Sequence, residues 1–130
     1  MPVFSEKSKS IIHTCDRRWD LILNDVIQIY DLTVIEGWRS DESQDELFRQ
    51  GKSKLQAGES KHNQDPSLAV DVCPYPIDWD DRRRFFLLAG MIFMAAKARN
   101  IEVRWGGDWD GDWIHTDQSF HDLPHFEILE

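Results

Sequence analysis

The sequence predicts a small α+β domain, in which a few antiparallel strands carry helices packed on one side. Two observations support this class. Short β-rich or apolar runs are mixed with stretches that have helical apolar spacing, and their order is too irregular for a doubly wound parallel sheet. The 130 residues, 41% hydrophobic and 30% charged, have the size and composition of one globular domain, 1–130.

The N-terminal part contains two expected helices and one strand. Apolar side chains recur at three- and four-residue spacing through residues 6–30, which predicts an amphipathic helix. Residues 32–36 form a β-rich run closed by Gly37, which indicates a strand. A further helix is expected over residues 42–50, because Ser40 or Asp41 can cap its first turn.

A charged residue interrupts the next apolar run. Residues 51–67 are polar and predict a long loop, a type of segment that is often functional in a compact domain. Residues 68–73 predict a mostly apolar strand with Asp71 in its middle. Burying this charge is costly unless it is paired or bound to a metal, so Asp71 is the strongest single-residue indication of a site.

The C-terminal part supplies the remaining expected elements. Residues 81–99 predict a helix whose middle, residues 85–96, is apolar nearly all round, so we expect it to be the buried central helix, with Met91 and Met94 filling the core. Residues 101–105 alternate and are predicted to be a strand, and residues 124–129 are predicted to be a terminal strand with His125 near its start.

Charge and composition exclude several classes of partner. The net charge of −9 disfavours binding to nucleic acid, which requires clustered Lys and Arg. No apolar run approaches the ~20 residues of a membrane span, and the N-terminus has no basic segment followed by an apolar core. We therefore expect no membrane insertion and no signal peptide. Cys15 and Cys73 are too few and too far apart for a disulfide scaffold, so we expect reduced thiols.

A catalytic zinc site is the main functional hypothesis. His62, Asp71 and His125 offer the imidazole and carboxylate ligands of an open zinc site with a fourth position for water. Asp122, three residues before His125, can reach over the metal as the base. Arg39 follows a predicted strand and is the candidate donor to the developing oxyanion.

Each of these assignments has a simpler alternative. Taken singly, the four polar residues of the proposed metal site are ordinary surface side chains. Arg39 can instead be a surface residue paired with a neighbouring acid. His115 and His121 lie close to the site in the sequence, and either can replace a ligand in this assignment.

Two other groups of residues in the segment before the last strand deserve an interpretation. Three carboxylates alternate around Gly111 as they do in calcium loops: Asp108, Asp110 and Asp112. The downstream Glu of a full EF-hand is missing, so the alternative is a solvated acidic loop. Three tryptophans can form a stacking wall for sugar or peptide, or can pack in the core: Trp105, Trp109 and Trp113.

Three motifs together resemble a known family. They are Ser60-Lys61-His62, Ala69-Val70-Asp71 and Asp122-x-x-His125-Phe126-Glu127. In combination they are similar to the zinc D-Ala-D-Ala carboxypeptidase family, and most similar to its compact phage-endolysin branch, the L-alanyl-D-glutamate peptidases. The resemblance extends from about Val34 to the C-terminus and includes residues 36–40, with Gln44 behind them, and the proline-rich residues 74–79. It implies an α+β fold of the Hedgehog/DD-peptidase type, with a small antiparallel sheet and packed helices.

The resemblance also implies roles for individual residues. One catalytic zinc would be held by His62, Asp71 and His125, with Asp122 as the catalytic base. Arg39 would contact the substrate carbonyl or carboxylate. Two further residues would belong to the substrate-binding set: Ser60 and Gln44. The segment 63–68 departs from the family, because the gap between the first His and the Asp is longer and has no Gly, so we expect this loop to bulge.

The activity implied by the resemblance is peptidoglycan hydrolysis. The expected substrate is the stem peptide of the bacterial cell wall, cut at its L-alanyl-D-glutamate bond by zinc-activated water. The expected context is a bacteriophage endolysin, a monomer that is made in the host cytoplasm and acts on the wall after release. Two alternatives remain: a D,D-carboxypeptidase that releases terminal D-alanine, and a non-catalytic zinc-containing cell-wall-binding module.

Overall fold

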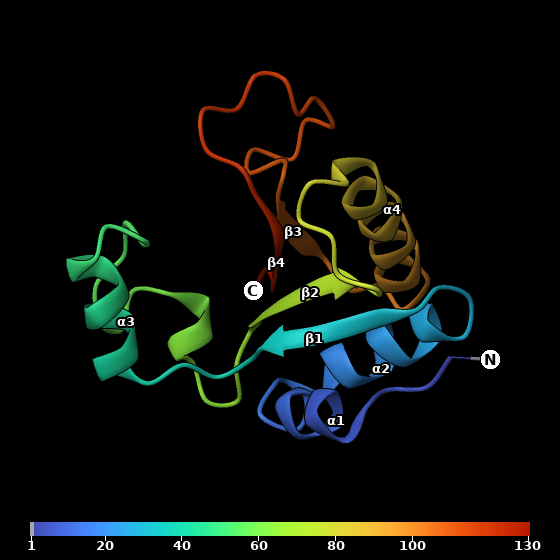
Figure 1. Ribbon diagram of the computed structural model, residues 1–130, viewed down its shortest axis with the longest axis horizontal. Coiled ribbons are helices and arrows are strands. Elements are labelled where there is room, and N and C mark those ends of the chain that lie inside the picture. The colour runs from blue at the N-terminus through green and yellow to red at the C-terminus, as the bar shows by residue number, and fades with distance from the viewer. Residues whose placement is uncertain (1) are drawn as a thin grey trace.

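Four α-helices, one short 3-10 helix and four strands make up the computed structural model, which describes residues 2–130 (Figure 1). In chain order they are α1 (Glu6–Ile12), α2 (Arg17–Ile27), β1 (Leu32–Glu36), α3 (Asp41–Arg49), η1 (Lys61–Asn63), β2 (Ala69–Pro74), α4 (Arg82–Ala98), β3 (Val103–Gly106) and β4 (Asp122–Ile128). The α+β class is confirmed, and each strand lies where the sequence places one.

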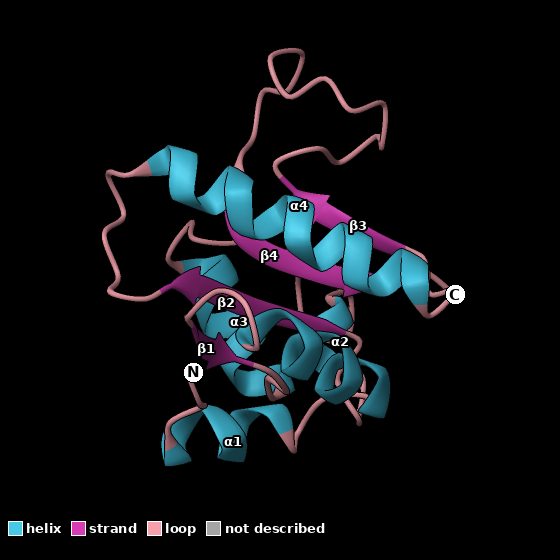
Figure 2. Ribbon diagram, turned by 90° about the vertical axis from the view of Figure 1, so that its right-hand side faces the viewer, coloured by secondary structure: helices cyan, strands magenta, loops and turns pink. Residues whose placement is uncertain are grey.

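The four strands form one antiparallel sheet in the order β1-β2-β4-β3. The C-terminal strand β4 therefore lies in the middle of the sheet, next to β2. Helices α2 and α4 lie together on one face of the sheet, and α3 lies beyond the other face (Figures 1 and 2). The long segment between β3 and β4 projects from the end of the sheet where β4 begins.

Alternation along β2 and β4 separates an apolar face from a polar one. Val70 and Phe126, which are partners in the register, are buried in the core with the helices. Asp71 pairs with His125 at the next position, so both side chains point away from that core, because neighbouring residues of a strand face opposite sides. The fold therefore places one charged row on the face that α2 and α4 leave uncovered.

The expected single helix over residues 6–30 is wrong in detail, because the chain forms two helices there. Asp16 caps the second one, and its side chain accepts a hydrogen bond from the Arg18 backbone N–H at 2.9 Å. Cys15 forms an isolated bridge with Ser67, which draws the junction toward the start of β2. A capping aspartate inside an amphipathic pattern favours a break between two helices.

Helix α4 buries one stripe instead of its whole surface, so the prediction of an all-round buried helix is wrong. The Met94 side chain is 71% exposed, and Leu87 is also exposed. A helix lying on a sheet contacts its neighbours over only part of its circumference, so apolar composition alone does not bury the outer side. Helix α3 starts at Asp41, and Ser40 is the one of the two expected residues that caps it.

The edge strand β1 is covered by α1. The Ser8 hydroxyl accepts a hydrogen bond from the Val34 backbone N–H at 3.1 Å, which satisfies a donor that an edge strand leaves free. Cys15 and Cys73 are free thiols and both are buried. Within residues 2–130, none of the helices combines the length and apolar character that crossing a membrane requires.

Trp19 joins α2 to the start of β2 and yields a test of the fold. Its buried indole N–H donates to the Leu68 carbonyl at 2.9 Å. We expect Trp19→Phe to lower the free energy of unfolding by about 1–3 kcal/mol, because the hydrogen bond is lost and the smaller ring leaves a void. Urea unfolding measures this difference.

The exposed Val3→Ala variant is the control and should change the free energy of unfolding by less than about 0.5 kcal/mol. Equal stability of the Trp19→Phe variant and the wild type would contradict the role given to this contact.

Candidate metal centre and active site

Asp71 and His125 form the floor of the candidate site. They are register partners on the adjacent strands β2 and β4, and the His125 Nδ1 lies 3.1 Å from the Asp71 Oδ1. Glu36 of β1 is the register partner of Asp71 on its other side. The sheet itself therefore sets the spacing of this charged row, and it does so through backbone hydrogen bonds alone.

His62 reaches the site from the short helix η1. The Ser60 hydroxyl accepts a hydrogen bond from the His62 backbone N–H at 3.1 Å, and the Asn63 side chain accepts from the Ser60 N–H, which completes a capping box. The Arg39 N–H donates to the His62 carbonyl at 2.8 Å. The polar loop predicted over 51–67 thus ends in a locally defined turn that aims the His62 ring at Asp71.

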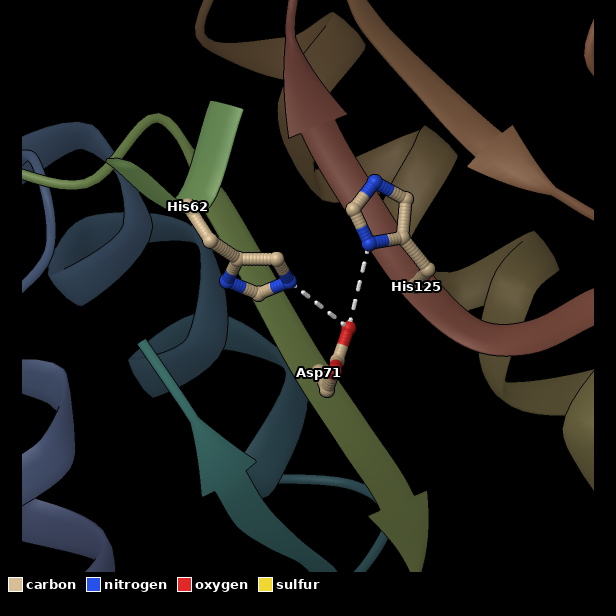
Figure 3. Close-up of side chains that lie close together, drawn as sticks. All are labelled: His62, Asp71 and His125. Carbon is tan, nitrogen blue, oxygen red and sulfur yellow. Dashed lines mark hydrogen bonds and ion pairs between the residues drawn. The ribbon is translucent and has the colours of Figure 1, made fainter. Parts of the chain in front are cut away.

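Three possible ligand atoms converge on one point (Figure 3). The His62 Nε2 is 3.2 Å and the His125 Nδ1 is 3.1 Å from the Asp71 Oδ1, and the three atoms lie within 4.8 Å of one another. Ligands at 2.0–2.1 Å around a tetrahedral zinc are separated by roughly 3.3 Å. The donor types and the spacing therefore fit a zinc ion.

The remaining nitrogen of each imidazole is held by an acceptor. The His62 Nδ1 is 2.7 Å from the Gly37 carbonyl, which can only accept, so this nitrogen carries the proton. The His125 Nε2 is 2.8 Å from the Glu127 Oε1 and donates to that carboxylate. In the neutral rings, the lone pairs that remain point at Asp71, where a cation is needed to relieve the repulsion.

The charges of the site shift its titrations. Burial opposes ionisation of Asp71, but the hydrogen bonds and charges of His125 and His62 hold its pKa well below its ordinary value. Burial would lower the pKa of His125, but Asp71 and Glu127 raise it to about 9. Without a metal, His125 therefore keeps a proton on the nitrogen that faces Asp71.

Asp122 opens β4 at the edge of the same site. Burial raises its pKa, and the charge of Asp71 adds to that shift, whereas His125, His62 and Arg39 oppose it. Gly106 permits this position, because a Cβ there would lie 2.0 Å from the Asp122 carbonyl oxygen. A carboxyl group with a raised pKa beside the metal ligands is suited to proton transfer.

Arg39 lies on the wall of the cleft and is fixed by two partners. Its Nε pairs with the Glu36 carboxylate, and its Nη1 donates to the Gln44 Oε1 at 2.8 Å. Gln44 is fully buried, and its amide donates to the Ser53 hydroxyl and the Leu55 carbonyl. The prediction gave Gln44 a substrate contact; the structure places it behind Arg39, where it orients the guanidinium.

The site opens into a cleft of about 600 Å³. Ser60, which the sequence analysis placed at the site, is buried in its wall. The loop after α3 forms one side, and Trp109 and Phe120 form another. The segment 63–68, which differs from the family pattern, turns toward the α1–α2 junction, where the Ser67 N–H donates a hydrogen bond to the Thr14 carbonyl. No residue of this segment lines the described cleft.

The three tryptophans have different environments. Trp105 is buried and stacks on Phe126 in the core. Trp109 lines the cleft and stacks on Phe120. Trp113 is 73% exposed and contacts Phe93 by an edge. A single wall of three tryptophans therefore does not form, and Trp109 alone of the three borders the cleft.

The alternative histidine ligands lie outside the cluster. His115 packs against the Phe86 ring of α4, and His121 is exposed. Among residues 2–130, two groups bring possible metal-ligand atoms within 4.8 Å of one another. They are the His62 cluster (His62, Asp71 and His125) and the acidic loop (Asp108, Asp110 and Asp112). No fourth residue thus adds a possible ligand atom to the His62 cluster in this part of the chain, so a metal held there would have a position for water or substrate.

The three carboxylates of the acidic loop do lie together, with Asp108 buried: Asp108, Asp110 and Asp112. Each accepts a hydrogen bond from a backbone N–H of its own loop, at 2.8 to 3.3 Å. Such contacts are ordinary for acids in turns. The calcium hypothesis gains no support from them and stays a prediction.

Glu127 and Arg104 were not assigned roles from the sequence. One carboxylate oxygen of Glu127 accepts a hydrogen bond from the His125 ring, and the other accepts a hydrogen bond from the Arg104 Nη2 at 2.7 Å. The signal was present in the His125-Phe126-Glu127 motif, because residues two apart on a strand share a face.

Comparison with known proteins identifies the family. A family model described as phage L-alanyl-D-glutamate peptidase matches residues 2–129. The chain belongs to this family. The resemblance drawn from the three motifs is thereby confirmed, as is the fold that it implied.

Members of the phage L-alanyl-D-glutamate peptidase family and similar enzymes share both sequence and fold with this chain. It is 28% identical over 114 residues to the peptidoglycan L-alanyl-D-glutamate endopeptidase CwlK of Bacillus subtilis, covering 76% of this chain and 61% of CwlK, so it spans less than two thirds of that relative. It is 29% identical over 107 residues to the L-alanyl-D-glutamate peptidase of Escherichia phage T5, covering 77% of each chain.

A solved structure supports the same likeness. The crystal structure of the L-Ala D-Glu endopeptidase ChiX of Serratia marcescens matches with a TM-score of 0.78 and 25% sequence identity, covering 97% of this chain and 89% of ChiX.

The protonation of His125 predicts how zinc affinity depends on pH. A metal must displace the Nδ1 proton of His125, whose pKa is about 9 in the metal-free protein. Below that pH the proton competes with zinc, so we expect the affinity to rise about tenfold per pH unit from pH 7 toward 9 and then to level off. Chelator competition at a series of pH values measures it.

Calorimetry in buffers of different ionisation enthalpy is the control, and it should show about one proton released per zinc at pH 7. An affinity that is constant between pH 7 and 8.5 would contradict the assignment of His125 as a ligand.

Proposed function

We propose that this chain is a zinc-dependent peptidase that hydrolyses the L-alanyl-D-glutamate bond of peptidoglycan stem peptides. The observation that carries the proposal is the convergence of His62, Asp71 and His125 on the floor of an open cleft. The family and the activities for which its relatives are named support this choice of bond. When bound, zinc lowers the pKa of a water ligand toward 7 and polarises the scissile carbonyl.

Asp122 is the general base of the proposed reaction. It takes a proton from the attacking water, whose oxygen bonds to the carbonyl carbon of the alanyl residue. When the C–N bond breaks, Asp122 returns the proton to the nitrogen of the glutamyl residue, which leaves as an amine. Burial and the charge of Asp71 raise the Asp122 pKa, so it is a stronger base than an ordinary carboxylate.

Arg39 donates hydrogen bonds to an oxygen of the bound peptide in this proposal. A guanidinium has five N–H donors, and Arg39 uses its Nε on Glu36 and its Nη1 on Gln44. The remaining donors are available to a carbonyl or carboxylate of the bound peptide. Because both partners fix the plane of the guanidinium, little reorganisation is needed when charge develops on the substrate oxygen.

The wider context follows from the family. We propose that residues 1–130 act as one catalytic domain of an endolysin, a monomer made in the cytoplasm of a bacterial host and acting on the wall after release. A non-catalytic module would need a saturated metal, whereas the cluster described here has three ligands and a cleft above it.

Mass spectrometry of peptidoglycan tests the bond that is cut. Purified sacculi are digested with the zinc-loaded protein, and we expect soluble fragments with new L-alanyl C-termini and new D-glutamyl N-termini. Release of free D-alanine alone would replace the proposal with a D,D-carboxypeptidase. A zinc-loaded protein that generates no new amino groups would exclude both enzyme readings and leave the binding module.

The role of Asp122 is tested by Asp122→Asn. The amide keeps the size of the side chain but cannot accept a proton, so we expect kcat to fall by about 100-fold or more while one zinc per chain remains bound. Enzyme assays and metal analysis of the same sample measure the two quantities. Asp80→Asn, at an exposed position outside the cleft wall, is the matched control. Loss of zinc in Asp122→Asn would make Asp122 a ligand instead.

A further inference from the structure

The cations of the cleft differ in how they are paired. Arg39 pairs with Glu36, and Arg104 pairs with Glu127, so both guanidinium groups are already neutralised by a carboxylate. Three lysines also line the cleft: Lys52, Lys54 and Lys61. In the described part of the chain, none of these three forms an ion pair. They supply the uncompensated positive charge of the site.

Lys54 differs from the other two because an aromatic ring holds its charge in place. Its Nζ lies 5.1 Å from the centre of the Phe120 ring, which belongs to the segment between β3 and β4. Lys54 itself lies on the loop after α3, so the contact joins two walls of the cleft. A cation over an aromatic face is attracted by the ring, and it keeps N–H donors free on its other side.

The ring that holds Lys54 is itself fixed. Phe120 stacks on Trp109 at 6.1 Å, and its carbonyl accepts a hydrogen bond from the Trp109 indole N–H at 3.1 Å. The Arg104 guanidinium lies 5.6 Å from the Trp109 ring on the way to Glu127. A continuous series of contacts therefore runs from the Lys54 ammonium through the two rings and Arg104 to Glu127, which accepts a hydrogen bond from His125. This series positions the charge of Lys54 relative to the candidate metal site.

The chemistry of the substrate supplies a partner for this charge. A glutamyl residue that is linked onward through one carboxyl group keeps its other carboxyl group free. If the bond cut lies on the amino side of that residue, the free carboxylate is close to the scissile nitrogen. Two acidic residues of the cleft wall have no ion-pair partner within the described residues and repel such a group: Glu59 and Asp122. An unpaired cation favours its binding.

We propose that Lys54 is a specificity-determining residue, which binds the free carboxylate of the glutamyl residue and so selects acidic stem peptides over amidated ones. This inference rests on the proposed function and names the group that the site recognises. A charge-assisted hydrogen bond to a positioned ammonium favours the carboxylate over a neutral amide of the same shape by about tenfold or more.

Two synthetic peptides test the proposal. Both contain the L-alanyl-D-glutamyl bond, and they differ only in that the free carboxyl group of the glutamyl residue is an amide in the second. We expect the zinc-loaded wild type to cleave the acid with a kcat/KM about tenfold higher than the amide. In Lys54→Met the ratio should fall to about one, through loss of activity on the acid alone, because the charge is gone and the apolar stem remains.

Two variants separate charge from structure. Lys54→Arg keeps a cation over Phe120 and should keep most of the preference, whereas Lys7→Met, on α1 and outside the cleft wall, should leave the ratio unchanged. Melting temperature and zinc content of each variant establish that the fold and the metal site are intact.

The outcomes are distinct. An unaltered preference in Lys54→Met, or an equal loss on both peptides, would overturn the assignment of Lys54. Equal cleavage of the two peptides by the wild type would remove the specificity itself while leaving the peptidase function standing. Cleavage of neither peptide by the wild type would defeat the proposed function, and the inference with it.

Discussion

The pairing of β2 with β4 is the constraint on which the rest of this structure depends. It sets Asp71 directly opposite His125 on the face of the sheet that α2 and α4 leave uncovered. A carboxylate in that position is costly to bury unless cationic or metal partners offset its desolvation. The two imidazoles meet this requirement from opposite sides. The apolar face behind them provides the burial that stabilises the sheet, so one set of strands serves stability on one face and chemistry on the other.

The polar groups of the site are each held by a second partner that is not itself part of the chemistry. The Gly37 carbonyl orients His62, Glu127 orients His125, and Gln44 orients Arg39. These contacts fix ring tautomers and the plane of the guanidinium before any ligand arrives. Side chains that are already oriented need little rearrangement when a metal binds or when charge develops on the substrate. The free energy of the transition state is lower as a result, and the reaction is faster.

The sequence was most informative where a local pattern determines the structure. The α+β class, the strands and the cap of α3 followed from periodicity and turn residues. Asp71 stood out because a charge within an apolar run has few explanations. Neither the break at Asp16 nor the exposed side of α4 followed from apolar spacing, because tertiary contacts decide both.

The candidate site was predictable to a different degree. The three candidate ligands came from a combination of motifs. No local rule would have brought His125 to Asp71, because that contact depends on β4 being inserted between β2 and β3. The family resemblance assigned Gln44 to the substrate-binding set. Gln44 is fully buried and contacts Arg39, so a motif alone does not tell which of its side chains reaches the cleft.

The net charge of −9 raises the question of how an acidic chain receives an acidic peptide. At physiological ionic strength, charges separated by more than about 8 Å in water are largely screened, so the overall charge has little effect on a bound ligand. What decides binding is the set of charges at contact distance within the cleft. There the guanidinium groups are neutralised by carboxylates, and the lysines are not. The acidic residues and the Lys and Arg residues of the cleft wall are equal in number, so the charge that a bound peptide meets there differs from that of the whole protein.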